Sequence, residues 1–255
     1  SHSYMTIDKA GNLIFGNGWA KYYFEKRTNE IKTLQIKNGF SSNGATSIYK
    51  DREDNIWFAD TRGIDKINNL DLENYYEING LLENEVTAIK ELKGGGYVFG
   101  HNLGLTVYKD KKFKRIVFTN AKVNSSRVLD IIQDRDGYVW FTANENGVGR
   151  LDEDGNIKWF FEKKDFLVSS VFQDKNGRIW FGAMNKLYYI ENGNVKLYEH
   201  SGKINNTFRK IFECESGGFY VAGVNGLWQV DGNRVEKIPN ENNKPLNVYA
   251  YLKTK

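Results

Sequence analysis

Apolar and polar residues alternate along most of the chain in short runs, and one apolar run returns at a regular interval. This run joins an aliphatic residue to one or two aromatic rings, as in Ile56-Trp57-Phe58-Ala59. Alternation and an excess of β-branched and aromatic residues predict strands. The six copies are centred on positions 14, 57, 98, 140, 180 and 220, so the steps are 43, 41, 42, 40 and 40 residues. A period of this size indicates a repeat architecture.

Each repeat has the same internal order. A turn such as Asp134-Arg135-Asp136-Gly137 precedes the aromatic run, and an apolar strand precedes that turn. A short loop and an alternating strand such as Gly104-Leu105-Thr106-Val107-Tyr108 follow the run, and a hairpin turn such as Asp231-Gly232-Asn233 leads to a last strand. One repeat therefore predicts four antiparallel strands.

Four strands in every forty or so residues, with a bulky aromatic residue in each unit, predict an all-β fold, a β-propeller of six four-stranded blades. The aromatic rings would fill the space between blades, and the Gly or Ala after them would let neighbouring sheets approach. We expect one domain, 1–255, in which 248–255 forms a closing strand, and the alternative is a fragment of a seven-bladed propeller. The predicted repeats are 3–45, 46–85, 86–126, 127–166, 167–206 and 207–247.

Composition agrees with short strands and tight turns, because aromatic residues make up 15% and there are 25 Gly but 2 Pro. The net charge of +4 is mild, and we interpret the densest basic stretch, 109–115, as a solvated hairpin end, so no nucleic-acid partner is expected. The single cysteine, Cys214, excludes an intramolecular disulfide. No apolar run has membrane-spanning length, so any membrane segment would belong to parts of the parent protein outside this chain.

The junctions between the first repeats carry a more specific pattern. Asn79-Gly80-Leu81-Leu82-Glu83-Asn84 leads to Val86-Thr87-Ala88-Ile89, and Asn38-Gly39-Phe40 begins the same pattern one repeat earlier. This pattern, followed by an acidic turn and an aromatic strand, resembles the two-component regulator propeller repeat. The match is closest over 46–68, looser in repeats four to six, where the junction pattern is lost, and spans the whole chain loosely.

That resemblance implies a sensor region of a bacterial two-component signalling protein, located in the periplasm or outside the cell. Such regions bind small molecules, often carbohydrates, or other proteins. The resemblance therefore implies a non-catalytic propeller that senses a ligand at the mouth of its central channel, with no cofactor. A protein–protein scaffold is an alternative function.

A second resemblance concerns Asp136-Gly137-Tyr138-Val139-Trp140-Phe141-Thr142 with Gly149-Arg150-Leu151, which is similar to streptogramin-lyase repeats. Those propellers are metal-assisted lyases that use His and Glu. The three histidines here are His2, His101 and His200, and they lack metal-ligand spacing. We therefore expect no catalytic residue and no metal site, and we keep a lyase as an alternative.

We expect a ligand site in the loops between the second and third strands, because the sequences of these loops vary among otherwise similar repeats. Asn, Arg, His and Trp side chains there suit sugar hydroxyls through hydrogen bonds and stacking. The predicted ligand-binding residues are Trp19, Arg62, His101, Asn102, Asn144, Glu145, Asn185 and Asn225. A lone buried or loop histidine such as His101 also has a purely structural interpretation.

Overall fold

The computed structural model describes residues 3–68, 71–118, 126–144, 146–161, 167–204, 207–214 and 218–239. Within them, the regular structure consists of 24 strands and three short 3-10 helices. The chain divides into two compact units, the first ending at Arg127 and the second beginning at Val128. Each unit holds three sheets, which we number 1 to 6 in chain order. The predicted closing strand, 248–255, lies outside the described residues, and the single domain stays a prediction.

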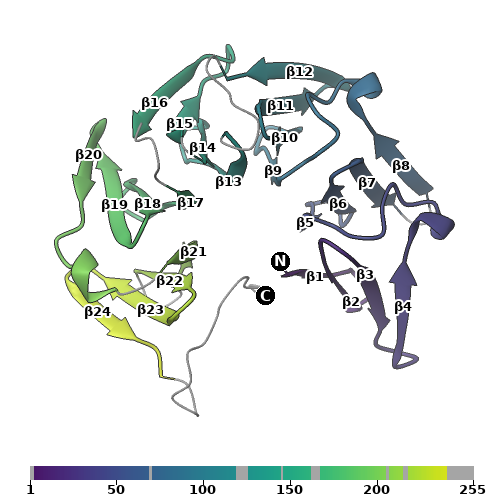
Figure 1. The fold of residues 1–255 in the computed structure, drawn as a ribbon, viewed down its shortest axis with the longest axis horizontal. Helices are drawn as coiled ribbons and strands as arrows, with labels where there is room; N and C mark the ends of the chain where they lie inside the picture. The colour runs from purple at the N-terminus through teal and green to yellow at the C-terminus, as the bar shows by residue number, and fades with distance from the viewer. Residues whose placement is uncertain are drawn as a thin grey trace. The chain divides into compact units, whose positions relative to one another are not determined.

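The first unit contains sheets 1, 2 and 3, each with its four strands in chain order and antiparallel (Figure 1). Its strands are β1 (Ser3–Ile7), β2 (Leu13–Asn17), β3 (Lys21–Glu25), β4 (Glu30–Leu34), β5 (Ser47–Lys50), β6 (Ile56–Asp60), β7 (Gly63–Asn68), β8 (Asp71–Tyr75), β9 (Ala88–Glu91), β10 (Tyr97–Gly100), β11 (Gly104–Lys109) and β12 (Lys112–Val117). The 3-10 helices η1 (Ile36–Asn38) and η2 (Glu77–Asn79) precede sheets 2 and 3.

The second unit repeats this arrangement in sheets 4, 5 and 6. Its strands are β13 (Val128–Gln133), β14 (Val139–Ala143), β15 (Gly147–Leu151), β16 (Ile157–Phe161), β17 (Val168–Gln173), β18 (Ile179–Ala183), β19 (Lys186–Glu191), β20 (Asn194–Leu197), β21 (Phe208–Glu213), β22 (Phe219–Gly223), β23 (Gly226–Asp231) and β24 (Arg234–Lys237). The helix η3 (Ser201–Lys203) lies between sheets 5 and 6 in the chain. The predicted six groups of four antiparallel strands are thus confirmed.

The turn between the first two strands is built around an aspartate. In sheet 2, Asp51 Oδ1 accepts the backbone N–H groups of Glu53 and Asn55 at 3.0 and 2.8 Å, and Oδ2 accepts Trp57 Nε1–H at 2.8 Å. Asp134 and Asp174 make the same three kinds of bond in sheets 4 and 5. The carboxylate therefore fixes both the turn and the ring of the aromatic strand, which explains the recurring Asp and Trp six residues apart.

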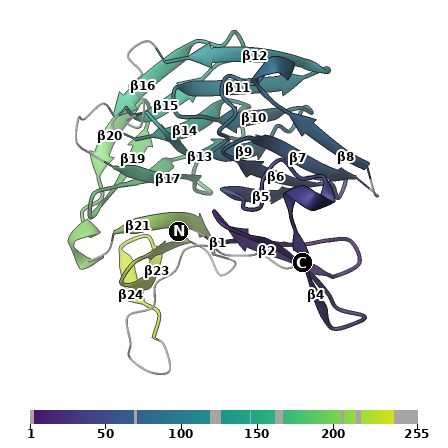
Figure 2. The same cartoon turned by 45° about the vertical axis from the view of Figure 1, so that its right-hand side comes forward.

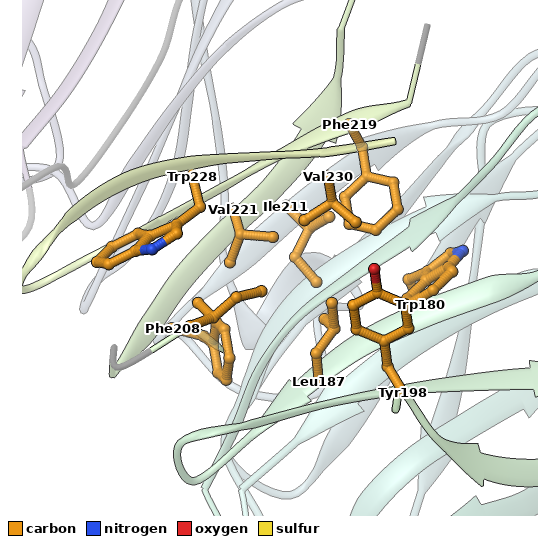
Figure 3. Close-up of a cluster of buried hydrophobic side chains, with 10 residues drawn as sticks. Trp180, Leu187, Tyr198, Phe208, Ile211, Phe219, Val221, Trp228 and Val230 are labelled. Atoms are coloured by element: carbon orange, nitrogen blue, oxygen red, sulfur yellow. The ribbon is translucent and has the colours of Figure 1, made fainter. Parts of the chain in front are cut away.

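Aromatic side chains fill the space between neighbouring sheets of one unit. Between sheets 5 and 6, Trp180 is 2% exposed and its ring lies 4.7 Å from that of Phe219 and 5.3 Å from that of Tyr198 (Figure 3). A Cβ on Gly182 would lie 2.6 Å from the ring of Phe208, so this glycine allows the close approach that the sequence predicted. In the first unit, sheets 2 and 3 also lie side by side (Figure 2), and Trp57 packs in the equivalent cluster.

Each sheet has two different ends. The loop between its second and third strands and the junction to the next sheet lie at one end, which we call the loop end. The Asp-centred turn and the hairpin between the third and fourth strands lie at the other, the turn end. The backbone bonds Ala45 N–H to Asn17 O and Val86 N–H to Asp60 O, of 2.8 and 2.9 Å, join loop and junction in sheets 1 and 2. The predicted site residues that the structure describes therefore belong to loop ends.

Candidate functional site

Four of the predicted residues occupy one equivalent position, two residues after the last residue of the second strand of their sheet. Trp19, Arg62, Asn185 and Asn225 all lie there, and all are exposed. The position is thus open to solvent in both units while its neighbours hold the loop in place. Variation at this position is therefore compatible with the fold, which is the property a recognition position needs.

Trp19 is a highly exposed aromatic side chain at the loop end of sheet 1, with 82% of its surface accessible. Its backbone is fixed, because Asn17 Oδ1 accepts the N–H groups of Trp19 and Ala20 at 2.9 and 3.1 Å. Gly44 packs so closely on the Gly18–Trp19 backbone that a Cβ there would clash. A fixed backbone with an exposed indole forms a preorganised stacking surface.

Arg62 lies at the equivalent loop of sheet 2, beside the buried Asp60. Its N–H donates to Asp60 Oδ1 at 2.6 Å, and the hydroxyl of Ser41 donates to Oδ2 at 2.7 Å. Burial raises the pKa of the Asp60 carboxyl, although these hydrogen bonds oppose the shift. The exposed guanidinium of Arg62 is thus carried on a loop that its neighbours anchor.

A buried ion pair supports the same loop ends. Lys21, only 1% exposed, places Nζ 3.0 Å from Asp65 Oδ2 and 4.0 Å from Asp60 Oδ2. Its ammonium also lies 4.5 Å from the ring centroid of Phe40. The N–H of Ser41 donates to Asp65, so the pair ties sheet 1 to sheet 2 and to the junction between them. One signal for this cluster is visible in the sequence, because a lysine stands where the other repeats have an aliphatic residue.

His101 is fully buried, and both of its ring nitrogens have partners inside sheet 3 and its junction. Nδ1–H donates to the carbonyl of Glu85 at 2.9 Å, and Nε2 accepts from the hydroxyl of Thr106 at 2.8 Å. The Thr106 oxygen in turn accepts the N–H of Leu82 at 2.9 Å. Burial lowers the pKa of His101 to about 4, so the ring is neutral at neutral pH. The geometry gives His101 a structural role beneath the loop.

Asn102 belongs to a polar network at the surface above His101. Its Nδ2 donates to Glu85 Oε2 at 2.9 Å, its Oδ1 accepts from Arg127 Nη1 at 3.3 Å, and the same Nη1 donates to Glu85 Oε1. Burial acts to raise the pKa of Glu85, but hydrogen bonds from Asn102 and Arg127 prevail and lower it. The side chains of Arg127 and Glu85 stay 33% and 29% exposed. A polar ligand therefore has access to fixed donors and acceptors here.

The remaining predicted residues belong to the second unit. Asn144 is half-buried, and its carbonyl accepts the N–H of Asn146 at 2.6 Å. Asn185 accepts from the hydroxyl of Thr207 at 3.5 Å, and Asn225 is exposed. Glu145 lies outside the described residues. The structure therefore assembles His101 and Asn102 with unpredicted Glu85 and Arg127, while the other predicted residues of each unit sit on separate loops.

One charged network of the second unit was missed by the sequence analysis. Asp130, Ser170 and Lys210 occupy equivalent positions on β13, β17 and β21, one residue before the aligned apolar residue. Asp130 accepts from Ser170 Oγ at 2.8 Å and from Lys210 Nζ at 2.5 Å. The N–H of Ile211 donates to Ser170 Oγ at 3.1 Å. The 40-residue spacing of these polar residues was the available signal.

Within the described residues, no three His, Cys, Asp or Glu side chains gather in a way that suits a metal ion. In the same residues, no helix is long and apolar enough to span a membrane.

A family model described as the two-component regulator propeller matches the chain at residues 39–62, 122–145 and 167–185. The predicted resemblance is therefore confirmed. Two of the three matches fall mainly in repeats four and five, where the junction pattern of this family is lost from the sequence. No curated protein matches the chain.

Solved structures share the fold. Virginiamycin B lyase from Staphylococcus aureus is 17% identical, with a TM-score of 0.75, and the match covers 94% of this chain and 84% of the lyase. The extracellular domain of a protein assigned as a hybrid two-component system from B. thetaiotaomicron is 15% identical, with a TM-score of 0.53, over 89% of this chain but 39% of that one. At these identities the likeness shows the fold alone. The predicted β-propeller is thus confirmed, and each four-stranded sheet is one of its blades.

Proposed function

Because the chain is a β-propeller that carries two-component regulator repeats, we propose that it is a non-catalytic sensing or interaction region of a bacterial two-component signalling protein. One of the similar structures is an extracellular domain, which supports a periplasmic or extracellular location. The parent gene tests this: we expect a membrane-spanning segment and a signalling module next to the propeller. A parent without either contradicts the proposal.

We further propose that ligand binds at the loop end of the first unit, and that the ligand is a neutral carbohydrate. The observation that carries this is the fixed, accessible network of Glu85, Asn102 and Arg127. Paired carboxylate, amide and guanidinium groups match the donors and acceptors of sugar hydroxyls. The exposed indole of Trp19 and the guanidinium of Arg62 supply further contacts, each from its own loop.

A thermal-shift screen with a panel of neutral oligosaccharides tests the binding proposal. A ligand that binds only the folded state increases the free energy of unfolding by mass action, by about 2.7 kcal/mol at a concentration 100 times its Kd. The melting temperature rises as a result. We expect Asn102→Ala and Arg62→Ala to reduce the shift. Arg27→Ala is the matched control, because Arg27 is an exposed arginine at the turn end of sheet 1. A shift that survives both site variants contradicts a loop-end site.

The lyase alternative has a specific test. A histidine-to-alanine variant of virginiamycin B lyase is described as catalytically inactive. In this chain, both nitrogens of His101 already bond to Glu85 and Thr106, and the ring is buried, which supports a non-catalytic role. Incubation of the protein with quinupristin and Mg²⁺, followed by mass spectrometry, should leave the antibiotic intact. Cleavage that disappears in His101→Gln or in a His200→Gln variant overturns the non-catalytic proposal.

A further inference from the structure

Two equivalent pockets open at the turn ends, one in each unit. The sheet 2–3 pocket lies between sheets 2 and 3 and has a volume of about 460 Å³, and the sheet 5–6 pocket has about 410 Å³. Trp57, Tyr97 and Lys66 of the first pocket correspond by strand register to Trp180, Phe219 and Tyr189 of the second. Both volumes suit a small ligand.

The sheet 2–3 pocket is lined by the partly exposed rings of Tyr75, Tyr97 and Tyr108, with the buried ring of Trp57 behind them. Trp57 and Tyr97 lie 4.6 Å apart, Tyr97 and Tyr108 stack at 6.5 Å, and Tyr75 and Tyr108 lie 5.8 Å apart. The carboxylate of Asp51 holds two of them, since it accepts from Trp57 Nε1 at 2.8 Å and from the Tyr97 hydroxyl at 2.6 Å. The rings therefore form a fixed surface for the face or edge of an apolar ring.

The charges on the two pockets differ. The sheet 2–3 pocket is lined by three cationic residues and two anionic ones, whereas the sheet 5–6 pocket has two cationic and three anionic. Arg52 is already engaged, because it pairs with Glu91 at 2.7 Å and donates to the carbonyls of Leu92 and Lys93. The lysines that remain are Lys66, whose Nζ lies 5.3 Å from the Trp57 ring, and the exposed Lys111 at the β11–β12 hairpin.

That hairpin is the dense basic stretch of the sequence, so Lys109, Lys112 and Lys114 add positive potential beside the pocket. In the sheet 5–6 pocket the positions of Lys66 and Lys111 are held by Tyr189 and Asn233, and the hairpin begins with Asp231. Among the ion pairs of the described residues, none involves Lys66 or Lys111.

From this we propose that the sheet 2–3 pocket is a second binding site, for a small apolar ring that carries a carboxylate or sulfate group. The aromatic walls contact the ring, and Lys66 and Lys111 neutralise the anion. The site lies at the opposite end of its sheets from the loop-end site, so it is independent of the proposed carbohydrate binding.

Indole-3-acetate and 4-nitrophenyl sulfate are suitable probes for the two anions, with indole-3-acetamide as the neutral counterpart. NMR titration at about 20 mM NaCl should give binding of at least one anion, and binding should weaken markedly near 0.3 M NaCl because salt screens the lysines. The affinity of the amide should be lower than that of indole-3-acetate by at least about five-fold, since the amide lacks the charge. The shifted resonances should include the indole N–H of Trp57, assigned from a Trp57→Phe spectrum.

The test variant is Lys66→Tyr combined with Lys111→Asn, which introduces the residues that the chain itself uses in the sheet 5–6 pocket. We expect anion affinity to fall about five-fold while amide binding is unchanged. Lys26→Asn with Lys37→Asn is the control, because it removes the same charge from exposed positions outside the pocket and its basic hairpin. No anion binding by the native protein, equal loss in both double variants, or equal affinity for acid and amide would each overturn the proposal.

Discussion

The two units solve the same structural problem differently at the end of each second strand. The equivalent residues are Asn17, Asp60 and His101, the last directly after β10, in the first unit, and Ala143, Ala183 and Gly223 in the second. The first group is polar and bonds to the loop or junction beside it. The residues of the second group are small and have no side-chain hydrogen-bonding group, so only backbone groups at these positions can bond to the loop. Charged residues of the second unit lie instead on its first strands, where Asp130, Ser170 and Lys210 meet.

Polar contacts therefore hold the loop ends in the first unit and the first strands in the second unit. A buried polar group without a partner is costly, so a loop held by buried polar groups tolerates few alternative conformations. The loop ends of the first unit should therefore be more sensitive to substitution than those of the second. The predictions below test that comparison.

The largest effect is expected at Lys21. It occupies the position of Ile64, Leu105, Val148 and Leu187, which are all fully buried. Lys21→Met leaves the carboxylate of Asp65 buried without its cation, and the loss of one partner from a buried pair costs about 3–5 kcal/mol. Urea unfolding should show this decrease in the free energy of unfolding.

A double variant sharpens the result. Lys21→Leu with Asp65→Thr installs the leucine and threonine that sheet 3 has at these positions, Leu105 and Thr106. Because the Lys21–Asp65 pair is then removed as a whole, and Asp60 keeps its hydrogen bonds from Ser41 and Arg62, stability should return to within about 1 kcal/mol of the native protein. A double variant less stable than Lys21→Met would show that the pair does not depend on mutual neutralisation.

The next largest effect concerns the turn end. Asp51→Ala removes the acceptor for two backbone N–H groups, for Trp57 and for Tyr97, so buried donors lose their partner. We expect a loss of about 2–4 kcal/mol. Asp152→Ala is the matched control, because Asp152 caps a similar turn through Asn156 but holds no tryptophan. Chemical denaturation of both variants should separate them clearly, and equal losses would contradict a role for the ring bond.

These contrasts show what the sequence makes visible. The repeat period and the recurring Asp and Trp are local signals, so the strands, the turns and the six sheets were predictable. The partners of Lys21 come from the next sheet, and those of Asn102 from the junctions before and after its sheet, so only the three-dimensional register brings them together. From the sequence, the candidate residues could be assigned to loops after second strands, but Glu85 and Arg127 could not be found.

A smaller, pH-dependent effect is expected from His101. Its pKa in the folded protein, about 4, lies below the ordinary value of 6.5, so the unfolded chain binds a proton first as the pH falls. The associated stability is present above pH 6.5 and is lost between there and pH 4. Linkage gives a decrease of about 1.4 kcal/mol between pH 7.5 and 5.5. His101→Asn should flatten this dependence in urea titrations, and an unchanged slope would contradict the burial of the neutral ring.

The smallest effect on stability is expected where the two units are most alike, at the exposed position two residues after the second strand in sheets 1, 2, 5 and 6. Trp19→Ala in the first unit and Asn185→Ala in the second both truncate exposed side chains, while Asn17 and the loop backbone stay in place. Each should change the free energy of unfolding by less than about 0.5 kcal/mol. The two variants should differ in oligosaccharide binding alone, which Trp19→Ala reduces. If Trp19→Ala instead destabilises the fold by more than about 1 kcal/mol, its indole packs against the protein and is not a free stacking surface.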